Sequence, residues 1–97
     1  MKKEKIELRK WDIAEHLSSE KDALAYLKAA IEDNDPEYLP HAIGAVARAR
    51  GMTHVARKAG VSRANLYKAF SDGGKPEFST VIKVIEALGF KFQIAKS

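Results

Sequence analysis

Residues 51–70 constrain this chain more than any other stretch, because they allow two short helices separated by one tight turn. Gly60 lies between the two helices and can adopt the positive φ that a tight exit from a helix requires. Thr53 and Ser62 are predicted to be the N-caps of the first and second helix, since each hydroxyl can accept from a free backbone N–H. Helical spacing predicts the buried faces, which are Val55, Ala56 and Ala59 in the first helix and Leu66, Ala69 and Phe70 in the second.

This layout predicts a helix-turn-helix over residues 52–70, a unit whose second helix enters the major groove of DNA. The first turn of that helix reaches deepest, where arginine suits guanine, asparagine suits adenine and alanine can touch a thymine methyl group. The predicted base-reading residues are Arg63, Ala64, Asn65 and Lys68. Capped helix ends and nearby polar side chains bind phosphate, which gives as predicted phosphate-binding residues Thr53, His54, Ser62, Tyr67 and Lys75. An ordinary helical hairpin with a solvated polar face is the alternative.

Charge is segregated along the chain behind a formal net charge of +4. Residues 48–75 hold seven basic residues and one acidic residue, a net of +6, and this block overlaps the predicted helix-turn-helix. Residues 12–37 hold eight acidic residues and two lysines, a net of −6. The basic block is typical of a surface that faces DNA phosphates. DNA would repel the acidic block, so we expect it to face away from DNA, to meet another partner, or simply to be solvated.

Composition narrows the remaining classes of protein. A length of 97 residues is typical of one domain, here residues 1–97, and the absence of cysteine excludes disulfides and thiolate zinc sites and suits a cytoplasmic location. The apolar runs are too short to span a membrane, and the basic N-terminus leads to no apolar segment of a signal peptide. The three histidines lack metal-ligand spacing, and no nucleophile adjoins a plausible base in a known motif. We therefore expect no metal, no cofactor and no catalytic activity.

Helices and one strand are predicted on both sides of this unit. A short strand or extended arm is expected over residues 1–11, with a short helix over residues 13–17 capped by Asp12. Longer helices are expected from Ser18 or Ser19 to about residue 32, from residue 36 or 37 to residue 50, and from residue 78 or 79 to Gly89. The apolar face of the first of these comprises Ala23, Leu24, Tyr26, Leu27, Ala30 and Ile31.

Residues 90–95 alternate apolar and polar side chains and predict a C-terminal β-strand. A single strand in a helical domain needs a partner for its backbone groups. The partner is the N-terminal segment, the same strand of a second subunit, or a sheet edge on another protein, and the sequence does not choose among them. The apolar side chains of the strand line either a dimer interface or the core, and they are Phe90, Phe92 and Ile94.

Eight segments between residues 11 and 94 carry a resemblance to a known family, and they are residues 11–17, 25–27, 29–36, 45–52, 55–63, 66–70, 76–81 and 87–89. With them the chain resembles the addiction-module antidote proteins, Xre-type helix-turn-helix antitoxins of bacterial type II toxin–antitoxin operons. The resemblance implies an all-α, lambda-repressor-like fold of about five helices around the DNA-binding unit. It also implies a RelE/ParE-like toxin that the antitoxin neutralises by direct binding, and a homodimer that represses its own operon at a palindromic operator.

One residue departs from the pattern of such motifs, which usually carry glutamine where this chain has His54. A neutral histidine can still donate or accept one hydrogen bond, and a charged one can pair with a phosphate. Two other functions are compatible with the sequence. One is a stand-alone regulator of the phage-repressor type with no toxin, and the other is a protein-binding module that has lost DNA binding.

Overall fold

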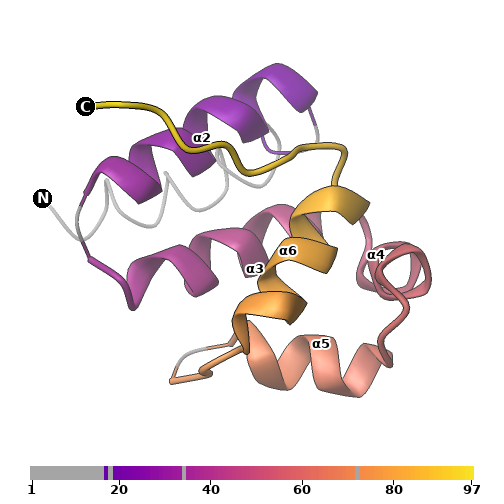
Figure 1. Ribbon diagram of the computed structural model, residues 1–97. Helices are drawn as coiled ribbons and strands as arrows, with labels where there is room; N and C mark the ends of the chain where they lie inside the picture. Colours follow the sequence, from indigo (N-terminus) through magenta and orange to yellow (C-terminus); the bar gives the residue numbers. More distant parts are fainter. Residues whose placement is uncertain (1–16, 18, 34, 72) are drawn as a thin grey trace, which may run out of the picture.

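The structure, a computed structural model, describes residues 17, 19–33, 35–71 and 73–97. The described part is helical (Figure 1) and consists of α2 (Glu20–Glu32), α3 (Tyr38–Arg50), α4 (Met52–Ala59), α5 (Arg63–Ala69) and α6 (Phe78–Ala87). The expected all-α class is confirmed for this part of the chain. The predicted arm or strand over residues 1–11 lies outside the described residues, as does the predicted helix over residues 13–17 except for Leu17, which is buried.

The long helices begin and end close to the residues predicted from the sequence. Ser19, one of the two expected caps, accepts a hydrogen bond from the backbone N–H of Asp22 at 3.4 Å, and α2 begins at the next residue. Helix α3 begins at Tyr38, slightly later than predicted, and ends at Arg50 as expected, with Gly51 as its C-cap. Gly89 has a φ of 93° and follows the end of α6, also as expected.

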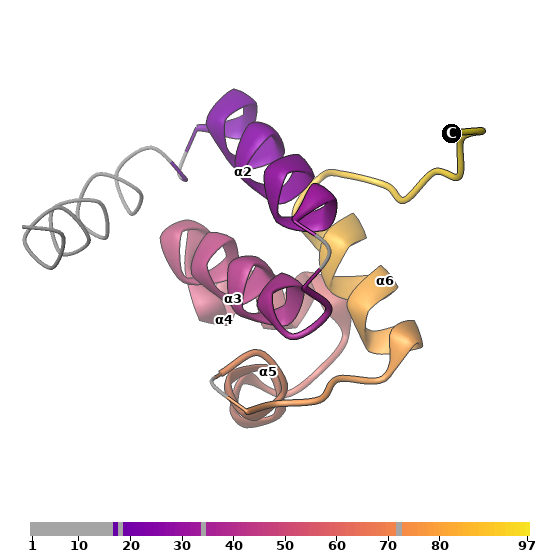
Figure 2. The same cartoon turned by 90° about the vertical axis from the view of Figure 1, so that its left-hand side faces the viewer.

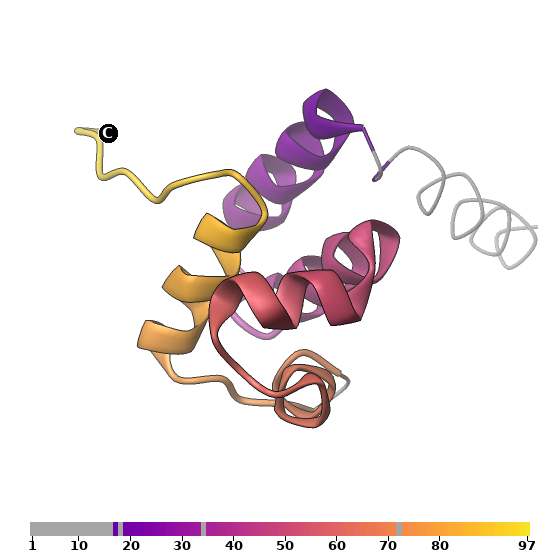
Figure 3. The ribbon, with the colours of Figure 1, turned by 90° about the vertical axis from the view of Figure 1, so that its right-hand side faces the viewer.

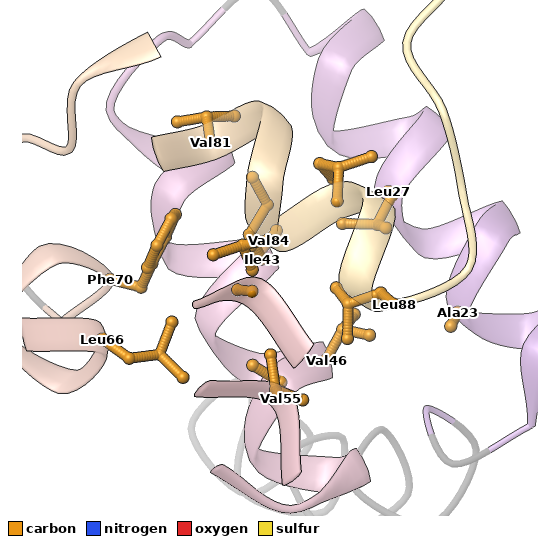
Figure 4. Packing of buried hydrophobic residues seen from close by; sticks show 14 of the residues in the cluster. Ala23, Leu27, Ile43, Val46, Val55, Leu66, Phe70, Val81, Val84 and Leu88 are labelled. Carbon is orange, nitrogen blue, oxygen red and sulfur yellow. The ribbon is translucent and has the colours of Figure 1, made fainter. Parts of the chain in front are cut away.

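The core lies where α3, α4 and α6 meet, and Leu66 and Phe70 close it on the side of α5 (Figure 4). Four aliphatic side chains from α3, α5 and α6 are completely buried there, namely Ile43, Val46, Leu66 and Val84, and Val55 on α4 is 1% exposed. Burial of one such aliphatic side chain contributes about 1.5–3 kcal/mol. The predicted buried faces of α4 and α5 are confirmed, except that Ala69 is only partly buried.

Helix α3 and the end of α5 approach each other unusually closely at Gly44. A Cβ atom built on Gly44 would lie 2.3 Å from the carbonyl oxygen of Phe70 and 3.2 Å from its Cβ. Only glycine allows backbone to approach this closely. Because Phe70 directly follows α5, this contact fixes how α5 is held against the rest of the domain.

Helix α2 buries a narrower face than the sequence predicted. Its buried residues are Ala23, Leu27 and Ala30, spaced as one stripe on a helix, and the stripe packs mainly on α3. Leu24 and Ile31, both predicted to face inward, are 41% and 49% exposed. That part of the prediction is wrong, because within the described part of the chain α2 packs mainly on α3 and buries only the stripe that faces it.

The predicted C-terminal strand is not confirmed. Residues 90–97 form neither helix nor strand, and the segment leads away from the helices in Figures 2 and 3. The backbone N–H of Phe90 donates to the carbonyl of Ile85 at 3.1 Å, which caps α6 instead of joining a sheet. Phe90 and Phe92 pack partly against the core, as one of the two predicted alternatives required, whereas Ile94 is fully exposed.

Arg50 connects the end of α3 to the end of α6. Its Nη1 donates to the carbonyl oxygen of Leu88 at 3.2 Å, and its guanidinium lies 5.9 Å from the centre of the Phe90 ring. The cation thereby sits at the carbonyl end of α6, where a helix dipole favours positive charge. Arg50 is thus turned into the domain, so it does not contribute to the basic surface that the charge pattern predicted.

Candidate nucleic-acid interface

Helices α4 and α5 are joined by a three-residue turn that begins at Gly60. Gly60 adopts the left-handed conformation with a φ of 75°, and the N–H of Val61 donates to the carbonyl of Ala56 at 3.1 Å. Ser62 then accepts a hydrogen bond from the backbone N–H of Asn65 at 3.0 Å. The predicted turn and the predicted cap of the second helix are both confirmed, so the direction in which α5 leaves the turn is well determined.

The predicted cap of the first helix is wrong. Helix α4 begins at Met52, with Gly51 in the cap position and no side chain bonded to the free N–H groups of the first turn. Gly51 has a φ of 102°, which ends α3 and allows α4 to start at the next residue, one position before Thr53. Thr53 and His54 consequently stand exposed in the first turn of α4, beside backbone N–H groups that lack a helical partner.

The outward side of α5 carries the predicted base-reading residues. Leu66 is completely buried against the core, whereas the residues around it on the other side of the helix are exposed. The exposed set comprises Arg63, Ala64, Asn65, Tyr67 and Lys68. An α-helix with one side free of the domain has the width that the major groove of B-DNA accommodates.

Arg63 and Tyr67 form a pair that the sequence analysis missed. The Arg63 guanidinium lies 5.4 Å from the centre of the Tyr67 ring, one helical turn along α5, and Tyr67 is 40% exposed. Stacking of this kind restricts the arginine side chain to a part of its conformational range. The spacing of four residues on one helix could have revealed the pair.

A hollow of about 730 Å³ lies between α5, the loop after it and the start of α6. It brings together three predicted site residues, Asn65, Lys68 and Lys75, and adds the hydroxyls of Ser71 and Thr80, which the sequence analysis did not single out. The Ser71 hydroxyl donates to the carbonyl of Lys68 at 3.3 Å. The two lysines and the Thr80 hydroxyl suit a phosphate group, whereas the Ser71 hydroxyl already donates its proton to Lys68. The carboxylate of Glu77 also lines the hollow and opposes an anion there.

The hollow gathers only part of the predicted site. Ser62 and Arg63, at the start of α5, do not line it. Thr53 and His54 lie in the first turn of α4. Their positions form one candidate interface only if a ligand extends over both helices, as a DNA duplex does.

The acidic residues around α2 and the basic residues of α5 lie at opposite ends of the described part of the chain. Helix α2 lies at the top and α5 at the bottom of all three ribbon views (Figures 1, 2 and 3). Basic side chains on α4 and α5 are Arg57, Lys58, Arg63 and Lys68, and acidic side chains in or near α2 are Glu20, Asp22, Glu32, Asp33, Asp35 and Glu37. The separation predicted from the sequence is therefore present in the described part of the chain.

Two other kinds of feature are absent from the described residues. They contain no group of three or more histidine, cysteine, aspartate or glutamate side chains placed to hold a metal ion. None of the described helices has the length and apolar character needed to cross a membrane.

Comparison with known proteins gives one family and one relative. The family model described as "Probable addiction module antidote protein" matches residues 7–96. A protein of Haemophilus influenzae described as "Uncharacterized protein" is 45% identical over 91 residues, which cover 94% of this chain and 94% of that protein. No solved structure matches the chain.

Proposed function

Because the chain belongs to the family described as probable addiction module antidote proteins, we propose that it has two binding activities and no catalytic one. As an antitoxin it neutralises a RelE/ParE-like toxin by direct binding in the cytoplasm. As an Xre-type, lambda-repressor-like regulator it binds the operator of its own operon and represses transcription. The toxin follows from the family, whereas DNA binding is supported by the candidate interface.

The exposed side of α5 is the observation that carries the DNA-binding proposal. Ser62 caps this helix, Leu66 anchors it in the core, and its other side is free. In the complex α5 enters the major groove, where Arg63, Ala64, Asn65 and Lys68 read bases. Tyr67 holds the Arg63 guanidinium beside the groove through their stacking.

Phosphate contacts orient α5 on the duplex. The first turn of α4 presents unpaired N–H groups next to Thr53 and His54 and binds one backbone strand. On the far side of α5, Lys75 at the hollow binds the other strand. The Ser62 and Tyr67 hydroxyls are further phosphate ligands within the interface.

A homodimer on a palindromic operator completes this proposal. Two α5 helices must then lie about 34–36 Å apart, one turn of DNA. The exposed C-terminal segment is the proposed dimer contact, in which Phe90, Phe92 and Ile94 form a strand paired with the same strand of a second subunit. Pairing would give the segment partners for its backbone groups and would cover the fully exposed Ile94.

Electrophoretic mobility shift with DNA from upstream of the chain's own gene tests the operator half of the proposal. Wild-type protein should bind this fragment and not a scrambled fragment of equal length. Co-expression with the neighbouring gene tests the antitoxin half, because the chain should restore growth that the neighbour's product arrests. A chain that binds its operator but has no toxic neighbour is instead a stand-alone regulator.

A further inference from the structure

An apolar hollow lies at the junction of α2 and α3, at the end of α2 that leads into the next helix. It measures about 300 Å³ and is lined by Ala30, Ile31, Asp35, Pro36 and Leu39. Four of these five side chains are apolar, and Ile31 is 49% exposed. A half-exposed isoleucine at a hollow of this kind is a surface that a partner protein can cover.

The exposed apolar surface continues along α2. Leu24 is 41% exposed and lies seven residues before Ile31, which places both on the same side of the helix about 10 Å apart. Lys28 lies between them and is exposed. The two apolar side chains therefore form a short stripe that leads into the hollow, interrupted by one cation.

The walls of the hollow are held in place by contacts between α2 and α3. The hydroxyl oxygens of Tyr26 and Tyr38 are 3.1 Å apart, and their rings meet edge to face at a centroid distance of 6.5 Å. In the connecting turn, the Asp35 carboxylate accepts a hydrogen bond from the backbone N–H of Glu37 at 3.1 Å. The backbone carbonyl of Asp35 accepts one from the backbone N–H of Tyr38 at 3.0 Å. The hollow is thus preformed, which lowers the cost of binding.

Negative charge is concentrated around the hollow at the end of this apolar surface. Glu32, Asp33 and Glu37 are exposed beside it, and Asp35 lines it. A partner that inserts an apolar side chain here must bring basic residues to the rim, since like charges across an interface are unfavourable. The same charge excludes DNA, so a protein bound here would leave α5 free.

We propose that the hollow between α2 and α3, with its apolar stripe and acidic rim, is the docking site for the toxin, and that the toxin inserts an apolar anchor flanked by lysine or arginine. This inference rests on the proposed antitoxin function and specifies where that function resides. Antitoxin bound to the toxin through α2 and α3 keeps α5 available to the operator, so one complex binds toxin and DNA together.

Titration calorimetry with the protein encoded by the adjacent reading frame tests the site. Ile31→Arg places a cation at the apolar anchor and should weaken binding at least about tenfold. Glu32→Gln removes one rim charge and should weaken binding by a smaller factor, more at low salt than at high salt. Lys28→Ala removes the cation within the stripe and should leave binding unchanged or tighten it, and Lys83→Ala on α6 is the control remote from the site.

Operator binding by each variant reports whether the fold is intact. The inference is supported if Ile31→Arg no longer binds the protein encoded by the adjacent reading frame but still binds operator DNA. It is overturned, with the antitoxin function intact, if wild type and Ile31→Arg bind that protein equally. It is also overturned if Ile31→Arg changes the oligomeric state, because the surface is then an interface between copies of this chain. Wild type that neither binds the neighbour's protein nor restores growth overturns the antitoxin function itself.

Discussion

Replacing Gly44 by alanine tests how tightly α3 and the end of α5 are packed. Alanine is the better helix former by about 1 kcal/mol, so propensity alone predicts a more stable protein. The added Cβ would lie 2.3 Å from the Phe70 carbonyl oxygen, an atom of the backbone that no side-chain rotation can move away. Normal contact needs a separation larger by roughly 1 Å, so α3 and α5 must shift apart.

The steric effect should exceed the gain in propensity. Overpacking of a core costs about 1–3 kcal/mol, and contact with backbone belongs to the upper part of this range. We therefore expect Gly44→Ala to lower the free energy of unfolding by about 1–2 kcal/mol, or the Tm by about 5–10 °C. Circular dichroism during urea and thermal unfolding measures both.

A matched control isolates the propensity effect. Ala29 is exposed on α2, and Ala29→Gly should cost about 1 kcal/mol with no packing change. If Gly44→Ala raises the Tm by the amount that Ala29→Gly lowers it, the close approach of α3 to Phe70 does not exist and the argument is refuted.

Three further predictions concern the candidate interface and the contact between α2 and α3. Ser62→Ala should lower the free energy of unfolding by about 1 kcal/mol because α5 loses its cap. Thr53→Ala should change it by less than about 0.5 kcal/mol because α4 has no side-chain cap. Equal losses for the two variants in urea unfolding would contradict the observed helix starts. Leu66→Ala should cost about 2–5 kcal/mol, and retention of the wild-type Tm would show that α5 is not anchored by this residue. Burial and the Tyr38 hydroxyl raise the pKa of Tyr26, so the folded chain keeps a proton that the unfolded chain releases near its ordinary pKa. Stability should therefore fall as the pH rises above about 10, and this fall should be smaller in Tyr26→Phe than in wild type when both are unfolded in urea at pH 8–11.

The parts of the fold that were predictable from sequence depend on local backbone chemistry. Gly60 and Ser62 predict the turn before α5 because a left-handed residue and a hydroxyl cap act over a few neighbouring residues. The buried faces of α4 and α5 follow from helical spacing, which also acts over a few neighbouring residues. The prediction that Thr53 caps α4 is wrong because Gly51 ends α3 and also occupies the cap position of α4. The spacing of residues along the sequence does not exclude this arrangement.

The features that the sequence did not predict depend on which helices and segments pack against each other in the fold. The exposure of Leu24 and Ile31 follows from α2 packing mainly on α3, a fact that periodicity along α2 does not contain. The alternation over residues 90–95 predicts a strand only where another strand is available, and the single chain caps α6 with Phe90 instead. The inward position of Arg50 also depends on a contact 38 residues away in sequence, with Leu88.

The salt dependence of operator binding by wild type and Arg63→Ala tests the central claim most directly. Fluorescence anisotropy with labelled DNA from upstream of the chain's gene measures the affinity at each salt concentration. A dimer that neutralises about six to ten phosphates should lose about 10³–10⁵-fold in affinity between about 50 and 200 mM salt. Arg63→Ala should reduce the preference for one base pair by about 1–3 kcal/mol with the salt slope unchanged. An affinity for DNA that does not change with salt concentration would contradict the assignment of α5 as the helix that reads DNA. A sequence preference that is the same in Arg63→Ala and wild type would contradict it as well.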